Sequence, residues 1–553
     1  MTTAPRALFL FATLAASAGA TLLAASCAEP VDQVSSGGRN TGGNGGAGGA
    51  GGDGGAGGII GAGGSGGGCV GDPKTCDQAS ACKSNIGCDF YPTVVANNVW
   101  SIFDFAVVVA NAGDEEAIIT VSRGSSTVAT DLVPPNELRK IYLPWVEELK
   151  GADMDACTNS KPLTASVRVS DGAYHLVSDR PVTVYQFNAL EYAPAGGPSG
   201  KDWSMCPGQS CNYPCLSYTN DASLLLPTTA LTGNYRITAQ SGWPNLGMGA
   251  YFAITGTQDN TTVTVKVSAK GNILKGDDIQ ATPGNGLLTF PLNKGEVVEL
   301  ASSGSADLGG SLVTASAPVQ VITGVPCIQA PLGTQYCDHI EEAVSPAETL
   351  GQHYFVTVPT GPNGDSVGHI VRLYGNVDGT KLSYQGAKPA NAPETINAGE
   401  VVDLGVVKGD FEITGSRELA VGSFMLGAEL VDPLAAESDK RGDPSQSHAT
   451  AVEQYRVKYV FLAPDDYTFS YVDVVQPMDA TVLIDGQPIG AVATPISSNY
   501  GVARVKLGPG NKGAHVLTAT APVGIQVMGY GTGTSYHYPG GLDLKPIAPP
   551  PPK

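Results

Sequence analysis

One short segment gathers side chains that could carry chemistry. From Tyr336 to Pro359 it reads YCDHIEEAVSPAETLGQHYFVTVP, and its candidate ligands are Cys337, Asp338, His339, Glu341 and Glu342. The carboxylates and the imidazole could bind a metal ion, or Asp338, His339 and Glu342 could support hydrolysis. The repeated ligand spacing of a His-Glu-x-x-His site is missing. We therefore favour a structural role, with Asp338 capping a turn and His339 bonded between modules, and keep metal binding and hydrolysis as alternatives.

Three other motifs are expected to be coincidental. GDSVG at 364–368 matches the nucleophile elbow Gly-x-Ser-x-Gly around Ser366, with His369 next. An elbow needs a helix after the serine, whereas the alternating pattern HIVRLYG predicts a strand. RGD at 441–443 lies in the polar stretch AAESDKRGDPSQSHAT, which we predict to be an exposed linker. NTT from Asn260 matches a glycosylation sequon without further support.

Acidic residues recur at turns that precede alternating strands. Asp259, Asp378 and Asp479 occupy equivalent places in DNTTVTVKVSAKG, DGTKLSYQG and DATVLIDG, and Asp114 begins a similar stretch. Such residues could bind calcium in the loops of an extracellular β-protein. Asp is also a usual turn residue, because its side chain bonds to the nearby backbone. We favour the turn role.

The first residues predict export and a lipid anchor. Arg6 precedes an apolar run that ends in LLAASC, with Cys27 last, which is typical of a signal peptide at 1–26. LLAASC resembles a lipobox, although Ala24 stands where Leu is usual. Cleavage by an ordinary signal peptidase is the alternative to lipidation of Cys27. The glycine-rich segment that follows, at 27–68, is predicted to be a disordered tether.

The cysteine count agrees with export from the cytoplasm. Apart from Cys27 there are ten, an even number suited to five disulfides in an oxidising compartment: Cys69, Cys76, Cys82, Cys88, Cys157, Cys206, Cys211, Cys215, Cys327 and Cys337. Their number does not fix their connectivity. A local bond between Cys327 and Cys337 is economical across the loop CIQAPLGTQYC. The cysteines within 69–98 lack the Cys-x-x-Cys spacing of a zinc ribbon, so we expect two disulfides there.

Composition excludes some classes of partner. The chain of 553 residues has a net charge of −20, and no basic stripe that could neutralise nucleic-acid phosphates. Contact with a membrane is expected through the lipid anchor only. Only 4 Trp and 7 Met disfavour an aromatic cage or a Met-rich groove. We predict no cofactor.

Loose internal repeats predict the fold. SDRPVTVYQF, ASAPVQVITG, GSRELAVGSF and ATAPVGIQVM recur from residue 178 onward, and NKGEVVEL (293–300) matches NAGEVVDL (397–404). Alternation with period two indicates strands with one buried face. We predict an all-β chain of tandem β-sandwich-like modules at about 99–218, 219–345, 346–445 and 446–545, followed by a Pro-rich tail at 546–553. One helical pattern, NELRKIYLPWVEELKG, is broken by Pro144.

Several segments together resemble a known family. GCDFYPTVVANNVWSIFDFAVVVANAG, DRPVTVYQFNAL, NDASLLLPT, CDHIEEAVSPAETLGQHYFVTVP and MGYGTGTSYHYPGGL are similar to the IgGFc-binding protein N-terminal domain, across Gly87 to Leu542. The resemblance implies an extracellular protein of adhesion or protein binding without catalytic residues. Binding of immunoglobulin itself is not carried over. We expect a non-enzymatic, lipid-anchored protein of the bacterial envelope or cell surface that binds a protein or glycan, with a hydrolase or a purely structural protein as alternatives.

Overall fold

Strands dominate the computed structural model, which describes residues 72–464, 466–508 and 513–552. They make up 43% of the chain against 7% for helices, which confirms the all-β class. The short helices and 3-10 turns are α1 (Cys76–Cys82), α2 (Glu147–Lys150), α3 (Ala428–Val431), η1 (Trp203–Met205), η2 (Pro207–Cys211), η3 (Ala347–Thr349), η4 (Glu437–Asp439) and η5 (Val452–Gln454). None of the described helices has the length and apolarity to cross a membrane. The expected signal peptide, Cys27 and the tether lie outside the described residues.

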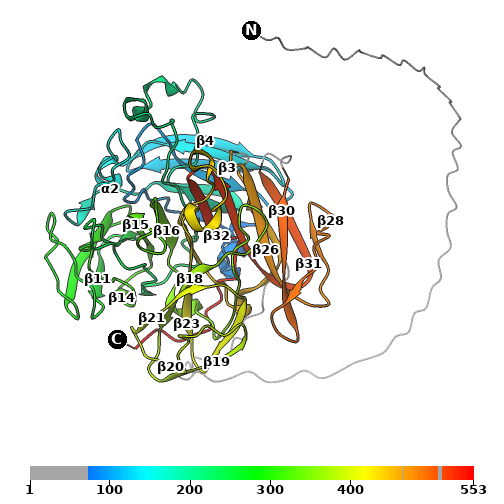
Figure 1. The fold of residues 1–553 in the computed structure, drawn as a ribbon. Coiled ribbons are helices and arrows are strands. Elements are labelled where there is room, and N and C mark those ends of the chain that lie inside the picture. Colours follow the sequence, from blue (N-terminus) through cyan, green and yellow to red (C-terminus); the bar gives the residue numbers. More distant parts are fainter. Residues whose placement is uncertain (1–71, 465, 509–512, 553) are drawn as a thin grey trace, which may run out of the picture. The chain divides into compact units, whose positions relative to one another are not determined.

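The strands fall into four modules, drawn in successive colours in Figure 1. The first contains β1 (Gly87–Phe90), β2 (Phe105–Ala110), β3 (Ala117–Arg123), β4 (Ser126–Val133), β5 (Leu138–Leu143), β7 (His175–Phe187) and β8 (Ala222–Leu225). The second contains β9 (Asn234–Arg236), β10 (Tyr251–Gly256), β11 (Thr261–Lys266), β12 (Leu287–Leu292), β13 (Val297–Ala301), β14 (Leu312–Ala315), β15 (Val319–Ile328) and β16 (Asp338–Ala343).

The remaining modules repeat this order. The third contains β17 (His353–Val356), β18 (His369–Gly375), β19 (Thr380–Gly386), β20 (Thr395–Ile396), β21 (Val401–Val407), β22 (Phe411–Gly415), β23 (Leu419–Met425) and β24 (Gln446–His448). The fourth contains β25 (Arg456–Leu462), β26 (Phe469–Pro477), β27 (Val482–Ile484), β28 (Gln487–Pro488), β29 (Thr494–Pro495), β30 (Tyr500–Leu507), β31 (Ala514–Gly531) and β32 (Thr534–Pro539).

Each module is built from two antiparallel sheets with the same strand order. The outer sheets run β4-β3-β7-β1, β12-β11-β14-β9, β20-β19-β22-β17 and β28-β27-β31-β25. The inner sheets run β5-β2-β7-β8, β13-β10-β15-β16, β21-β18-β23-β24 and β30-β26-β31-β32. In the first and fourth modules one long strand, β7 or β31, passes through both sheets. The sequence repeats therefore correspond to modules that share one strand order.

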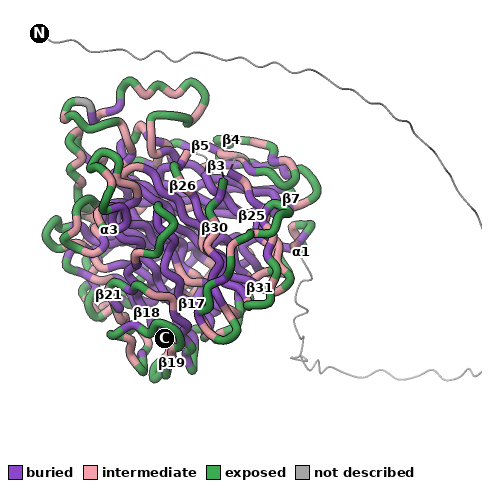
Figure 2. The backbone as a smooth tube through the Cα atoms, turned by 45° about the vertical axis from the view of Figure 1, so that its right-hand side comes forward, coloured by how far each residue is buried: buried purple, intermediate pink, exposed green. Residues whose placement is uncertain are grey.

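Burial separates the two kinds of sheet. The outer strands β11 and β12 alternate between buried and exposed residues, as their sequences TTVTVK and LLTFPL predict. The inner strands β2 and β15 are buried at every position, because their sheets have neighbours on both faces. Figure 2 shows the same division, with buried strands inside and exposed turns around them.

The strand pairing places module boundaries differently from the predicted ones. β8 pairs with β7 and β24 pairs with β23, so each closes the preceding module, whereas boundaries at 218 and 445 would assign them to the next one. β6 (Val167–Val169), from the first module's stretch of sequence, pairs with β13 of the second. The predicted helical pattern is wrong over its first half, where Leu138–Leu143 forms β5, and only Glu147–Lys150 is helical.

The last strand of each module meets its neighbours in a ring. β8 contacts β16 and β32, and β24 also contacts β16 and β32, so the four modules close on one another. In Figure 1, β16 and β32 lie where the modules meet. One apolar cluster contains Tyr185 of the first module together with Tyr538 of the fourth, which buries the contact between the two ends of the repeat.

Candidate binding site

A single carboxylate joins the last strands of the four modules. Asp221 Oδ1 accepts hydrogen bonds from the backbone N–H of Ala222 (2.9 Å) and His537 (3.3 Å), and Oδ2 accepts from Glu341 (3.0 Å) and Gln446 (2.8 Å). The four donors lie one each on β8, β32, β16 and β24. Burial raises the pKa of Asp221 well above its usual value, and the backbone bonds oppose that rise. Asp221 therefore holds the ring together.

Two further carboxyl groups lie in the same buried core. Asp338 is 0% exposed and Asp443 is 1% exposed. Asp338 Oδ2 accepts from the hydroxyl of Thr534 (2.8 Å), which links β16 to β32. Within the part of the chain that the structure describes, Oδ1 of Asp338 and Oδ1 of Asp443 have no hydrogen-bond partner. Burial raises the pKa of both groups well above the usual value, and their mutual repulsion adds to the rise for Asp338.

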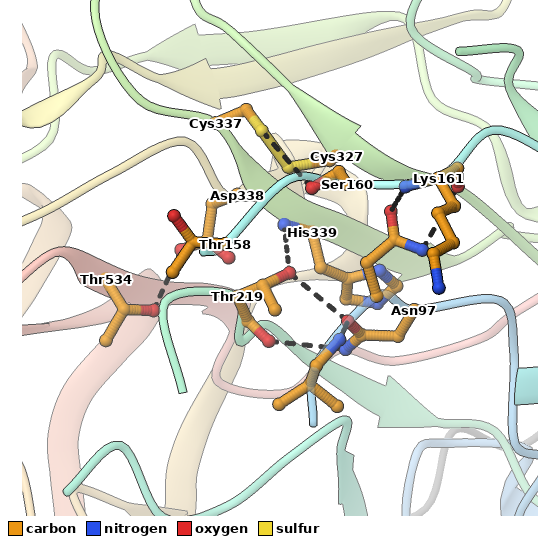
Figure 3. The surroundings of a disulfide bond; sticks show 12 residues. Asn97, Thr158, Ser160, Lys161, Thr219, Cys327, Cys337, Asp338, His339 and Thr534 are labelled. Atoms are coloured by element: carbon orange, nitrogen blue, oxygen red, sulfur yellow. Dashed lines mark hydrogen bonds between the residues drawn. A yellow bond between two sulfur atoms is a disulfide. The ribbon is translucent and has the colours of Figure 1, made fainter. Parts of the chain in front are cut away.

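The cluster that could have carried chemistry is enclosed on β16. His339 and Glu341 are fully buried, and the imidazole Nε2 lies 3.3 Å from Glu341 Oε2. Glu341 also accepts from Ser223 Oγ (3.1 Å) and Gln186 Nε2 (3.3 Å), while the backbone N–H of His339 donates to Thr219 Oγ1 (2.9 Å). Figure 3 shows His339 and Thr219 together with the nearby disulfide Cys327–Cys337. These contacts join β16 to the first module, which is the bonding between modules expected of His339.

The arrangement gives metal binding and hydrolysis no assembled site. Among the described residues no group of three or more His, Cys, Asp or Glu side chains is placed to hold a metal ion. Glu342 Oε1 accepts from the backbone N–H of Ala343 (2.9 Å), and His339 lies against Glu341 rather than against Asp338. Asp338 bonds across modules to Thr534 instead of capping a turn, which differs from the expectation.

Disulfides link the described chain in several places. The structure contains Cys76–Cys88, Cys157–Cys211, Cys206–Cys215 and Cys327–Cys337. The last is the predicted local bond, and Cys82 is disulfide-bonded as well. Cys69 lies outside the described residues. Several disulfides in one chain are typical of proteins outside the cytoplasm.

A cavity of about 430 Å³ lies between loops of all four modules. The disulfide Cys327–Cys337 forms part of its wall, and Asp443 lines it from the third module. Its aromatic and charged lining residues are Tyr213, Tyr218, Trp243, Tyr336, Glu437 and Lys440. This is the kind of site in which small ligands and side chains bind, mostly apolar with a few polar groups.

The aromatic walls are fixed by local contacts. Tyr218 packs edge-on against Tyr213 (ring centroids 6.3 Å apart) and donates from its hydroxyl to the carbonyl of Pro214 (3.0 Å). Cys206–Cys215 closes the loop that carries Tyr213. The Tyr336 hydroxyl donates to Glu437 Oε1, and Lys440 Nζ lies 2.9 Å from Glu437 Oε2. Sequence analysis singled out none of these rings, although Cys206, Cys211 and Cys215 bracket Tyr213.

The other sequence motifs take structural places. Ser366 is exposed in a loop and strand β18, not a helix, follows it, so no nucleophile elbow forms. The RGD segment is not the exposed linker that we predicted. Gly442 and Asp443 are buried, because the segment enters the core just before β24, and Arg441 pairs with Asp432 (2.7 Å).

Two of the four acidic turn residues bond to backbone, as expected for turn chemistry, whereas Asp114 pairs with Lys74 Nζ (3.0 Å). Asp259 Oδ1 accepts from the N–H of Lys294 (3.1 Å), and Asp378 Oδ1 accepts from the N–H of Ala398 (3.0 Å). Lys294 and Ala398 belong to the matching sequences NKGEVVEL and NAGEVVDL. Two of the sequence repeats are therefore joined by the same hydrogen bond in two modules.

Fold and disulfides together define a class: a disulfide-bonded β-protein built from repeated modules around a buried polar core. Comparison with known proteins gives the family. The chain belongs to the family described as IgGFc binding protein, whose model matches residues 221–529, more than half of the chain. The matched span is narrower than the resemblance seen from Gly87 to Leu542, and it begins at Asp221.

One curated relative and one solved structure illustrate these similarities. The human IgGFc-binding protein is 25% identical over 322 residues, which are 58% of this chain and 6% of the human protein. This chain therefore spans a small part of that relative. An anti-sigma factor domain-containing protein from Clostridium clariflavum is 12% identical and covers 57% of this chain and 83% of its own. Its TM-score is 0.11, so it carries no argument about the fold.

Proposed function

We propose that this chain is a non-enzymatic binding protein of the cell surface or envelope, and that it recognises an extracellular protein or glycan through the cavity between its modules. The observation that carries the proposal is the cavity of about 430 Å³, walled by Tyr213, Tyr218, Trp243 and Tyr336. Aromatic residues are enriched at binding surfaces because they give a large contact area at low entropic cost. Family membership supports a binding role.

The anchor is a second part of the proposal. Acylation of Cys27, at the end of LLAASC, would attach the chain to a bacterial envelope membrane, and the glycine-rich segment 27–68 would hold the modules away from it. No cofactor, metal ion or nucleic acid is part of this function. Intact-mass spectrometry of the native protein tests the anchor: we expect a chain that starts at Cys27 with added acyl mass. A chain that starts elsewhere, without acyl mass, contradicts it.

Binding can be tested with the purified native chain on a sensor surface. The candidate partners are immunoglobulin Fc, taken from the relative's name, arrayed extracellular proteins and arrayed glycans. We expect saturable binding to at least one of them, and at least tenfold weaker binding when Trp243 and Tyr336 are both replaced by alanine. The matched control is Leu287→Ala, at an exposed apolar residue of β12 that lies outside this cavity (69% exposed).

Three outcomes would contradict the proposal. No saturable partner would favour a purely structural envelope protein. Binding that the double variant leaves unchanged would place the site elsewhere. Turnover of a hydrolysable substrate that is lost in His339→Ala would favour the hydrolase alternative instead.

A further inference from the structure

The cavity has a feature that points to its ligand: a buried acidic residue in its lining with an unpartnered carboxyl oxygen. Asp443 lines the cavity, is 1% exposed and has an Oδ1 atom without a hydrogen-bond partner among the described residues. Asp338 Oδ1 is also buried and unpartnered within the described residues, but Asp338 does not line the cavity. A buried carboxyl oxygen without a donor is costly, so a ligand that supplies donors at this place would gain free energy.

The cavity's own lysine does not fill this role. Lys440 lines the cavity, but its Nζ atom lies 2.9 Å from Glu437 Oε2, and that carboxylate also accepts from the Tyr336 hydroxyl. Lys440 is thus engaged at the rim with Glu437. No hydrogen bond or ion pair between Lys440 and Asp443 is formed in the described part of the chain, which leaves Asp443 open to a second positive charge.

The walls suit an organic cation better than a metal ion. Tyr213, Tyr218, Tyr336 and Trp243 line the cavity, and an ammonium or guanidinium group near the face of such a ring is attracted by the ring's electrons. Three of these four rings are tyrosines, and they come from two modules. A hard cation such as calcium would need six or more oxygen ligands, which these apolar walls do not provide.

We propose that the cavity binds the ammonium or guanidinium group of a lysine or arginine side chain that an extracellular protein partner presents. This inference rests on the proposed binding function and specifies its ligand. The apolar walls would pack against the methylene stem, and the charged end would reach the carboxyl group of Asp443. The net charge of −20 would attract a basic partner before contact.

The proposal implies that protons leave when the ligand enters. Burial raises the pKa of Asp443, and a cation beside the carboxyl group would favour its ionised form and so the release of a proton. The charged and titratable groups near Asp443 are Asp338 in the core behind it, and Tyr336, Glu437 and Lys440 around the cavity. Affinity should therefore rise with pH, and calorimetry in buffers of different ionisation enthalpy should detect proton release.

The experiment compares Nα-acetyl-lysine methylamide with the neutral Nα-acetyl-norleucine methylamide, both titrated into the native chain by calorimetry. We expect the lysine compound to bind at least tenfold more tightly and to release protons. Asp443→Asn should remove most of this difference, because it keeps the shape of the side chain but not its charge. Asp378→Asn, at an exposed turn, is the matched control and should leave binding unchanged.

A second variant covers the case in which Asp443→Asn does not fold. Tyr336 is 42% exposed, so Tyr336→Ala should fold and should weaken the lysine compound at least threefold, whereas Tyr336→Phe should retain most of the affinity. Equal binding of the lysine and norleucine compounds, or unchanged binding in Asp443→Asn, overturns the inference. If arrayed glycans bind through the cavity and the lysine compound does not, the proposed function stands and this inference is wrong.

Discussion

Replacing Asp221 by alanine should destabilise the ring of modules more than any change at a surface acid. Four backbone N–H groups donate to this carboxylate, and three of them, on Glu341, Gln446 and His537, belong to other modules. Each buried donor left without an acceptor costs about 1–3 kcal/mol. Three such donors give about 3–9 kcal/mol, and removal of a buried charge recovers part of it. A loss of about 3–6 kcal/mol is a large share of the roughly 5–15 kcal/mol that stabilises a typical fold.

The assay is urea denaturation of the native, oxidised chain, combined with hydrogen exchange. The amides of Glu341, Gln446 and His537 should exchange faster in Asp221→Ala than in the wild type, while amides of the outer sheets should change less. Asp221→Asn should lie between the two, because one amide oxygen can still accept hydrogen bonds. Asp378→Ala is the control: it removes one exposed acceptor of a turn N–H and should cost less than about 1 kcal/mol.

Two results would refute this reasoning. If Asp221→Ala lowers the free energy of unfolding by less than about 1 kcal/mol, the carboxylate does not hold the strands together. If the three amides keep their protection while the outer sheets lose theirs, the loss arises somewhere other than the ring.

Further predictions concern pH, an ion pair between modules and the RGD segment. Burial raises the pKa of Glu299 to about 8. The folded state thus binds the extra proton between about pH 4.5 and 8, and the stability contributed by this group falls as pH rises through that range. As pH rises from 5 to 8, the free energy of unfolding of Glu299→Gln, measured by urea denaturation, should increase by about 3–5 kcal/mol relative to that of the wild type. If the two proteins show the same dependence of this free energy on pH, the prediction is wrong. Arg168→Ala removes an ion pair with Glu296 (2.8 Å) and should lower the free energy of unfolding by about 1–3 kcal/mol. Hydrogen exchange in β6 should become faster. Unchanged exchange there would show that the ion pair does not hold β6 in place. Integrin-bearing cells should not adhere to the folded chain through 441–443, because its aspartate is buried, and adhesion blocked by a linear RGD peptide would show otherwise.

Sequence patterns predicted the modules because their outer strands follow simple physics. Strands such as β3 and β11 alternate between buried and exposed residues, and the turns between them use Asp, Asn and Gly, whose roles are local. The late strand of each module also recurs with a Pro or a charged residue at its start, where the chain passes from one sheet to the other. Local signals of this kind can be recognised without knowledge of distant contacts.

The inner strands and the cavity could not be predicted in the same way. For the sequence DHIEEA, metal binding and hydrolysis stayed open beside the favoured structural role, because charged residues are usually exposed unless they have a function. On β16 all six residues are buried, and their partners, such as Thr219 and Thr534, lie far away in the sequence. The cavity likewise joins loops whose residues are distant from one another, so neither its rings nor Asp443 formed a local pattern.

The sequence repeat is weak at the last strand of each module, and this weakness has a physical cause. The residues whose N–H groups reach the central carboxylate pair with Phe187, Gly324, Phe424 and Met528, at matching places in four late strands. The residue before each donor is Asp221 in the first module and Ile340, Ser445 and Tyr536 in the others. Carboxylates at all four of these equivalent positions would repel one another, and only the first module has an acid at this position. A ring with one shared acceptor therefore requires its repeats to differ at the centre, even while the outer sheets keep their common pattern.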